Sequence, residues 1–574
     1  MTTEKAFRDR EILSEAQSRG SVATLGAFFR LSGPGWLQSA ITLGGGSLGG
    51  ALYLGVIGGS SMLWLQLVAI VIGVIMLSAI SYVTLSTGKR PYGAINEFVN
   101  PVLGASWITA TILANMIFIL PQFSLCFDVL DKNFGLVGED PTMTSKIVVS
   151  ALIGILAFGI VVLSFKPGFA SRMFDALLKL IVGAIVICFV LAVVSLARMG
   201  EINGWEVLQG FIPDFSQWWN PSPGLADKVN GLGDAAKTFW GQALVERQQS
   251  VMISTTATAV GINMTFLLPY SMLARGWDKP FRGLARWDLM TGMAIPFIVV
   301  TSCIVLASAN AFHAKIDSEF QSDDWTVVQQ SRLFNGTESM IMKRMLEADP
   351  NSLTAPASGE MEVSSEQWQS EQVAKFIAKM NVDERIVASA LVKPNTEALA
   401  KTLQPVLGSW SNAVFGFGVL GMGFSTIIIL MLINGYAVAE IFNRYQSNRL
   451  RIFGAGAACV VGFCWFWIWT GDSKTYLVIV ASSFAAILLP IAYFTFMALM
   501  NNRDLLGDEK PTGARMTIWN VLMGIGVIGA LLQSVAAVST KIDSPNGPYV
   551  IGGVVTFVIL AVVGFSARPR RESS

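Results

Sequence analysis

The sequence predicts an all-α polytopic membrane protein with about twelve transmembrane helices, and three observations support this fold class. Hydrophobic residues make up 53% of the 574 residues and charged residues only 14%, which is too little charge for a soluble protein of this length. A window of about 19 residues finds apolar segments repeatedly along the chain. Two of these segments are interrupted by glycine, a pattern typical of the broken helices of secondary transporters.

The chain begins with a charged segment, residues 1–31, that precedes the first apolar run. No small-residue cleavage site of a signal peptide lies before that run, so we expect the first helix to be retained. Lysine and arginine gather in the loops after even-numbered spans, for example at Lys89 and Arg90. This positive-inside bias predicts that the N-terminal segment and the tail, residues 568–574, are cytoplasmic in a protein integral to the cell membrane.

The predicted spans form two groups of five and a final pair. Residues 32–199 hold spans one to five, residues 250–500 hold spans six to ten, and residues 501–567 hold a cytoplasmic loop and the last two spans. The two interrupted spans are the first and the sixth, which is the spacing of two inverted five-helix repeats. The spans centre near Leu43, Ile70, Ile112, Ile155, Ile185, Met264, Phe297, Gly421, Val460, Ala485, Ile525 and Phe557.

Two insertions break this rhythm, at residues 200–249 and 314–406, and both are expected to be extracellular. The larger insertion has an excess of acidic residues and then a helix-like run that starts at Ser365. We interpret it as a solvated cap or lid rather than a separate functional domain, because it contains no recognisable catalytic or ligand motif.

The first interrupted span contains the run Gly44-Gly45-Gly46-Ser47. Glycine frees the backbone there, and a break inside a bilayer is tolerated only where the freed N–H and C=O groups face protein or a polar cavity. We therefore expect Gly44, Gly45, Gly46 and Ser47 to form one half of a substrate site near the membrane midplane.

The second interrupted span contains Gly261 and, directly after it, Ile262, Asn263 and Thr265. Pro269 follows in the same span and removes a backbone donor. We expect Ile262, Asn263 and Thr265 to form the other half of the substrate site, although isolated polar residues in membrane bundles also serve as hydrogen bonds between helices.

Further polar residues are candidates for a pathway or a gate. Asp175 and Lys179 are spaced for an ion pair at a gate, although Lys179 could equally snorkel to the membrane surface. The other candidates are less specific, since each could instead join two helices. These candidates are Asn115, Gln122, Tyr270, Ser425 and Thr426.

The composition argues against several other classes of protein. The net charge of +1 gives no basis for binding nucleic acid, so the expected partners are the lipid bilayer and a small-molecule or ion substrate. One histidine and five cysteines, none in a metal-ligand spacing, predict no resident metal or other cofactor. We see no set of nucleophile, base and oxyanion donors, and therefore expect no enzyme.

Several short motifs occur along the chain in a characteristic order and spacing. The motifs are Gly33-Pro34-Gly35-Trp36, Leu63-Trp64, Thr87-Gly88-Lys89, Gly210-Phe211-Ile212-Pro213, Phe312-His313, Gly423-Phe424-Ser425-Thr426 and Leu488-Leu489-Pro490-Ile491-Ala492. In this order and spacing they make the chain similar to the natural resistance-associated macrophage protein (NRAMP) metal transporters of the amino acid-polyamine-cation superfamily. The resemblance implies a LeuT-like fold with two inverted five-helix repeats, alternating access, and a transported divalent cation.

The sequence departs from this family where the family binds its metal. Gly44 to Ser47 align with the family's Asp-Pro-Gly-Asn, and Thr265 or, in a gapped alignment, Leu268 stands at its ligating methionine. None of the family's usual metal ligands is therefore present. Asn115 and Phe118 stand in the third span, where the family has acidic residues for protons.

These departures leave three functional hypotheses. The family-implied one is transport of a divalent metal, although the usual proton-coupled transport of Mn²⁺ or Fe²⁺ is not expected without a carboxylate ligand. The first alternative is a carrier of an amino acid, small organic solute or anion held by backbone amides of the broken first helix. The second is a receptor or scaffold that does not transport.

Overall fold

The computed structural model describes residues 2–138, 141–165, 169–353, 365–392, 411–469, 477–542 and 547–566. Every regular element in these ranges is helical, which confirms the predicted all-α fold class. Nine helical stretches among the described residues are long and apolar enough to cross a bilayer, and one of them, Gly45–Thr87, continues through two predicted spans.

All twelve predicted span centres lie within or beside helices of the structure, in the predicted order. The first and sixth spans are each split in two, as the glycine patterns predict. The spans are α3 (Pro34–Thr42) with α4 (Gly45–Gly58), α5 (Leu63–Thr87), α7 (Pro101–Asp128), α8 (Met143–Ser164), α9 (Phe169–Arg198), α12 (Asp234–Ala259) with α13 (Ile262–Ala274), α14 (Arg282–Leu289) with α15 (Ile295–Phe312), α23 (Ser411–Ile441), α24 (Asn448–Phe463), α26 (Leu477–Asn501), α28 (Gly513–Ile542) and α29 (Gly547–Ser566).

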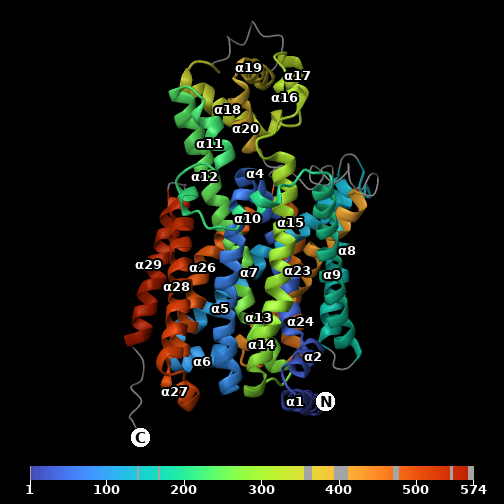
Figure 1. Cartoon of the computed structure of the whole chain (residues 1–574), viewed down its shortest axis with the longest axis vertical. Helices are drawn as coiled ribbons and strands as arrows, with labels where there is room; N and C mark the ends of the chain where they lie inside the picture. Colours follow the sequence, from blue (N-terminus) through green and yellow to red (C-terminus); the bar gives the residue numbers. More distant parts are fainter. Residues whose placement is uncertain are drawn as a thin grey trace.

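Shorter elements connect these spans. They are α1 (Thr2–Ser18), α2 (Ser21–Leu31), η1 (Gly59–Met62), α6 (Pro91–Phe98), η2 (Val129–Asn133), α10 (Gly204–Gly210), η3 (Phe215–Trp218), η4 (Lys279–Phe281), η5 (Met290–Ala294), α25 (Trp465–Ile468), α27 (Arg503–Leu506) and η7 (Gly507–Glu509). Figure 1 shows α1 and α27 at one end of the bundle, which we call the inner end.

The broken helix α4 occupies the centre of the bundle, and every one of its residues is buried. It packs against α12, α15 and α23. Close approach to α15 depends on Gly55, because a Cβ atom there would lie 2.4 Å from the carbonyl oxygen of Val305. The peripheral helices α9 and α28 expose apolar side chains such as Leu180 and Leu532, as expected of helices that face lipid.

The two insertions meet in a single helical cap at the opposite, outer end (Figure 1). Lys228 from the first insertion pairs with Asp383 from the second at 2.8 Å, and the indole N–H of Trp240 donates to Glu384 at 2.7 Å. The extracellular location of the cap stays a prediction. The cap helices are α11 (Pro223–Asn230), α16 (Ser318–Gln321), α17 (Trp325–Gln330), α18 (Phe334–Ala348), α19 (Ser365–Lys379) and α20 (Val382–Ala390).

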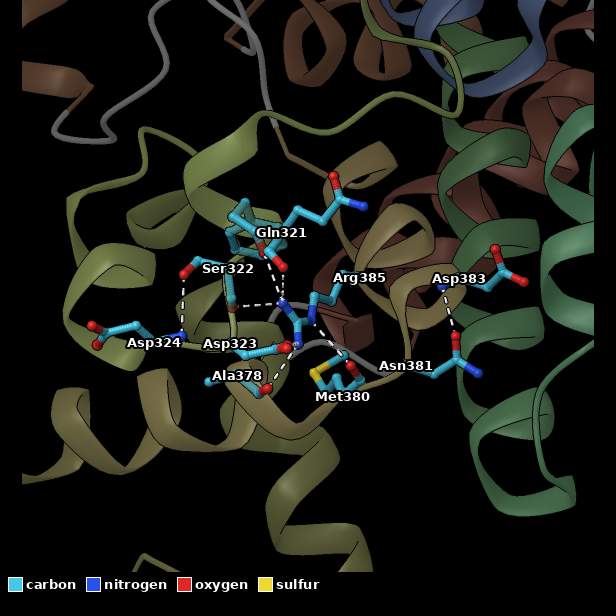
Figure 2. A network of polar contacts seen from close by, with 10 residues as sticks. Gln321, Ser322, Asp323, Asp324, Ala378, Met380, Asn381, Asp383 and Arg385 are labelled. Atoms are coloured by element: carbon cyan, nitrogen blue, oxygen red, sulfur yellow. Dashed lines mark hydrogen bonds and ion pairs between the residues drawn. The ribbon is translucent and has the colours of Figure 1, made fainter.

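Arg385 holds the second insertion together (Figure 2). Its guanidinium group is buried and donates to the backbone carbonyls of Gln321 and Ser322 at 2.7 Å and of Ala378 at 2.8 Å. The guanidinium group also forms an ion pair with the Asp323 carboxylate, with Nη2 and Oδ1 3.0 Å apart. A buried charge is tolerated only when it is paired and hydrogen-bonded, so this network fixes the loop after α16 against α19 and α20.

Candidate functional site

The first helix break lies at Leu43 and Gly44, between α3 and α4. Gly44 has an extended backbone (φ −92°, ψ −178°), and the Ser47 hydroxyl donates back to the carbonyl of Thr42. The carbonyl of Ala40, in the last turn of α3, accepts from the Ser425 hydroxyl at 3.0 Å. Because a helix end buried in apolar surroundings needs such partners, Ser425 stabilises the break.

Gln122 joins α7 to this break. Its side-chain oxygen accepts the backbone N–H of Gly45 at 3.0 Å, which caps the first turn of α4. Its Nε2 atom is buried and has no hydrogen-bond partner among the described residues. Gln122 therefore presents a free donor beside the break, and an unpaired buried amide costs about 1–3 kcal/mol unless a ligand or water meets it.

The second break lies at Val260 and Gly261, between α12 and α13. The side-chain oxygen of Asn263 accepts the backbone N–H of Met264 at 2.9 Å. Thr265 donates its hydroxyl to the carbonyl of Ile262 and accepts the indole N–H of Trp107 at 3.1 Å. Thr265 is thus engaged within α13 and with α7, and neither it nor Ile262 lines the cavity described next.

A cavity of about 20 Å³ lies where the two breaks meet. Its polar lining includes Gly46, Ser47, Gln122, Asn263 and Thr426, all of which the sequence analysis named as site or pathway candidates. The volume is about that of a single water molecule. The lining contains hydroxyl, amide and apolar groups and no ionisable side chain, and no cluster of potential metal ligands occurs among the described residues.

The other pathway candidates lie away from this cavity. Asn115 is fully buried, and both of its amide atoms lack partners among the described residues. Lys179 donates to the carbonyl of Ser32 at 3.1 Å, which links α9 to the start of the broken first span. The side chain of Asp175 falls outside the described residues, so the ion pair with Lys179 stays a prediction.

Tyr270 belongs to an aromatic column that leads from the second break toward the inner end. Its ring stacks on Phe266 with centroids 4.2 Å apart and lies 5.4 Å from the ring of Tyr445. The guanidinium carbon of Arg451 lies 4.7 Å from the centroid of Tyr445, within the range of a cation–π contact. The column thus packs side chains of α13 against Tyr445, in the link between α23 and α24, and Arg451 of α24.

An ion pair that the sequence analysis missed closes this column. Arg90, between α5 and α6, contacts Glu440 near the end of α23 at 2.5 Å, and the Glu440 side chain is only 3% exposed. The available signal was an acidic residue within a long apolar run, which in a membrane segment indicates a functional position. Its partner could not be identified from sequence, because Arg90 lies 350 residues away.

Comparison with known proteins identifies the family. The sequence profile of the natural resistance-associated macrophage protein-like family matches residues 35–329 and 382–537. No curated protein sequence gives a significant match.

Solved structures of a manganese transporter from Eremococcus coleocola match the fold. A mutant form is 12% identical over 94% of both chains with a TM-score of 0.50, and the complex with an aromatic bis-isothiourea substituted compound is 12% identical over 94% of both chains with a TM-score of 0.51. At this identity the likeness shows the fold alone. Because the family profile covers most of the chain, the protein belongs to the natural resistance-associated macrophage protein-like family and is an integral membrane transporter.

Proposed function

We propose that this chain is a secondary transporter that carries a divalent cation by alternating access, and that it holds the ion with neutral oxygen atoms and through the water molecules the ion retains. The observation that supports this proposal is the cavity at the two helix breaks, lined by Ser47, Gln122, Asn263 and Thr426 without a carboxylate, thiol or imidazole. The matching solved structures are of a manganese transporter, so we take the substrate class, a metal ion, from the family. We take the chemistry of the ligands from the residues that line the cavity in this chain.

The ligand chemistry favours an ion that keeps part of its water shell. A dehydrated Mn²⁺ or Fe²⁺ in the bilayer needs anionic or strongly donating ligands to replace its water. Mg²⁺ gives up water reluctantly and is usually bound with several waters still attached. Hydroxyl and amide groups can accept hydrogen bonds from such waters. A neutral site therefore suits a hydrated ion better than a bare transition metal.

The size of the cavity supports alternating access. A space of about 20 Å³ cannot hold a hydrated ion. Substrate entry then requires α4 and α13 to separate from α7 and α23, because the described conformation leaves too little room for the ion. The predicted orientation, with both chain ends cytoplasmic, makes the cap end the side of entry for an imported ion.

A small organic anion or amino acid is the second candidate substrate. The backbone N–H groups of Gly46 and Ser47 lie in the first turn of α4, where a helix supplies no intrahelical partner for its N–H groups. Such donors at the positive end of a helix can accept a carboxylate. The Gly45 N–H is already taken by Gln122, which reduces the number of donors available to an anion.

The deciding measurement is the thermal stability of the purified protein with Mg²⁺, Mn²⁺, amino acids and small carboxylates, followed by uptake into proteoliposomes. Our proposal predicts a saturable rise in melting temperature with Mg²⁺ that is lost in Asn263→Ala. Gln66→Leu is the matched control, since Gln66 is buried, has no partners among the described residues and does not line the cavity. A shift in melting temperature with carboxylates only would mean that the substrate is an anion and not a cation. The absence of both a shift and uptake would favour a receptor.

A further inference from the structure

A second cavity lies outside the transport site, in the insertion that precedes α12. It has a volume of about 550 Å³ and lies between α11, the link before it and one face of α12. Sites for small ligands usually enclose about 300–1,000 Å³. None of its lining residues belongs to the site at the two helix breaks.

The sequence of α12 creates the floor of this cavity. Lys237, Gly241, Val245 and Gln249 recur every four residues and therefore share one helix face. Gly241 leaves this face open, because the only atom near a Cβ at that position would be Cγ1 of Val229 at 3.7 Å, an ordinary contact. A methyl group fits there, whereas a larger side chain would project into the cavity.

Hydrogen bonds donated by the amide nitrogen atoms orient three side chains in the cavity. Gln249 donates to the carbonyl of Trp218 at 2.8 Å, Asn220 donates to the carbonyl of Ser216 at 3.2 Å, and Gln242 donates to the Glu246 carboxylate at 3.0 Å. The side-chain oxygen atoms of these amides have no partner among the described residues. Because an amide whose nitrogen donates can still accept through its oxygen, these groups present a set of acceptors to the cavity.

The charges and the aromatic surface restrict the ligand class. The ammonium group of Lys237 has no ion-pair or hydrogen-bond partner among the described residues, and Glu246 is the one acidic residue of the lining. A simple anion would meet Glu246 and a simple cation would meet Lys237, so the lining favours a ligand without net charge. Trp219 is 69% exposed and supplies an indole surface at the edge of the cavity.

We propose that this cavity binds a saccharide unit. Sugar hydroxyls both donate and accept hydrogen bonds. They can therefore donate to the amide oxygens and the carboxylate of the lining and accept from the lysine ammonium group. The C–H face of a sugar ring is apolar and can pack on the indole of Trp219. The site is separate from the transport pathway and does not depend on the identity of the transported ion.

The test is calorimetric titration of the full-length protein in detergent with maltose, cellobiose and chitobiose, and with glycine as a zwitterionic control. We expect saturable binding of at least one disaccharide, weakened at least about tenfold by Trp219→Ala and by Gly241→Leu. Gly241→Ala is the matched control and should change the affinity less than about twofold, because its methyl group meets only an ordinary contact. Uptake of the transported ion should be the same in all three variants.

Three results would overturn the proposal. They are the absence of saturable binding by every disaccharide, binding that Gly241→Leu leaves intact, and binding of glycine without any disaccharide. If Gly241→Leu fails to fold, Trp219→Ala still decides, since an exposed side chain can be truncated without loss of the core.

Discussion

Replacing Glu440 by glutamine should loosen the inner closure of the transporter. The Glu440 carboxylate on α23 contacts Arg90, which follows α5, and the Tyr270 and Tyr445 rings pack 5.4 Å apart beside this pair. These contacts connect α5 and α13 with α23 and α24, so they must separate if the cavity is to open toward the inner end. Glu440→Gln keeps the shape of the side chain and removes its charge.

The size of the effect follows from the exposure of the two partners. A hydrogen bond to a charged group contributes about 1.5–3 kcal/mol, and solvent screening lowers that value at exposed sites. Glu440 is 3% exposed but Arg90 is 38% exposed, so we take the lower end, about 1.5 kcal/mol. That energy corresponds to a shift of roughly tenfold in the equilibrium between the closed and inward-open conformations.

A buried reporter on α3 can measure this shift. Ser39 is fully buried, and its hydroxyl has no partner among the described residues, so Ser39→Cys is a mild change. In a protein without its five native cysteines, the rate at which a maleimide labels this thiol reports the open population. We expect labelling to become about tenfold faster in Glu440→Gln.

A second ion pair at the same end serves as the control. Lys89 and Glu97 lie 3.0 Å apart with side chains 44% and 41% exposed, and an exposed pair contributes little. Glu97→Gln should leave the labelling rate unchanged. Equal rates in wild-type protein and Glu440→Gln, or an equal acceleration by Glu97→Gln, would refute the assignment of the Arg90 and Glu440 pair as the inner closure.

Three further predictions concern the cap and the helices beneath it. Burial lowers the pKa of His313, which lies just beyond the outer end of α15, so the folded state favours the neutral histidine. The stability of the protein should therefore fall as the pH drops below about 6.5. The melting temperatures at pH 7.5 and 5.5 should differ less in His313→Gln than in wild-type protein. Arg385→Met removes the guanidinium donor from several backbone carbonyls, those of Gln321, Ser322 and Ala378 among them, and should cost roughly 3 kcal/mol, seen as faster hydrogen exchange across residues 318–353 and 365–392; unchanged exchange would contradict the network. Gly55→Ala drives a methyl group against the carbonyl of Val305 and should cost about 1–3 kcal/mol by thermal melting, whereas Gly183→Ala meets no atom within 4 Å and should not destabilise.

The helix breaks could be predicted from sequence because their causes are local. Glycine at Gly44 and Gly261 removes the side chain that restricts the backbone, and the surrounding apolar runs place both breaks inside spans. Ser47 and Asn263 were expected beside the breaks by the same reasoning, and both line one cavity; Gln122, which also lines it, was named only as a pathway or gate candidate. The family and its helical fold were likewise identified correctly from short motifs in their order.

The partner of each polar residue could not be predicted, because partners are set by tertiary packing. The Thr265 hydroxyl accepts the indole N–H of Trp107 on α7, a partner that the sequence did not indicate, and its predicted contact with substrate stays a prediction. The Ser425 hydroxyl donates to the carbonyl of Ala40, which the sequence likewise did not indicate, and its role in a pathway also stays a prediction. Lys228 and Asp383, which join the two insertions, lie 155 residues apart in the sequence. No local sequence pattern predicts a contact between positions so far apart.

The packing around the first break leaves no room for a side chain at position 44. The resemblance to the family aligns Gly44 with an aspartate of that family, and a Cβ atom at Gly44 would lie 2.2 Å from the hydroxyl oxygen of Thr426 and 2.9 Å from the carbonyl oxygen of Ile41. An aspartate would therefore displace both the α23 side chain and the end of α3 before its carboxylate reached the cavity. Gln122 at the same time caps the turn of α4 that follows Gly44. Gly44, Thr426 and Gln122 thus form one interdependent arrangement, and a carboxylate at position 44 would require coordinated substitutions around it rather than one change.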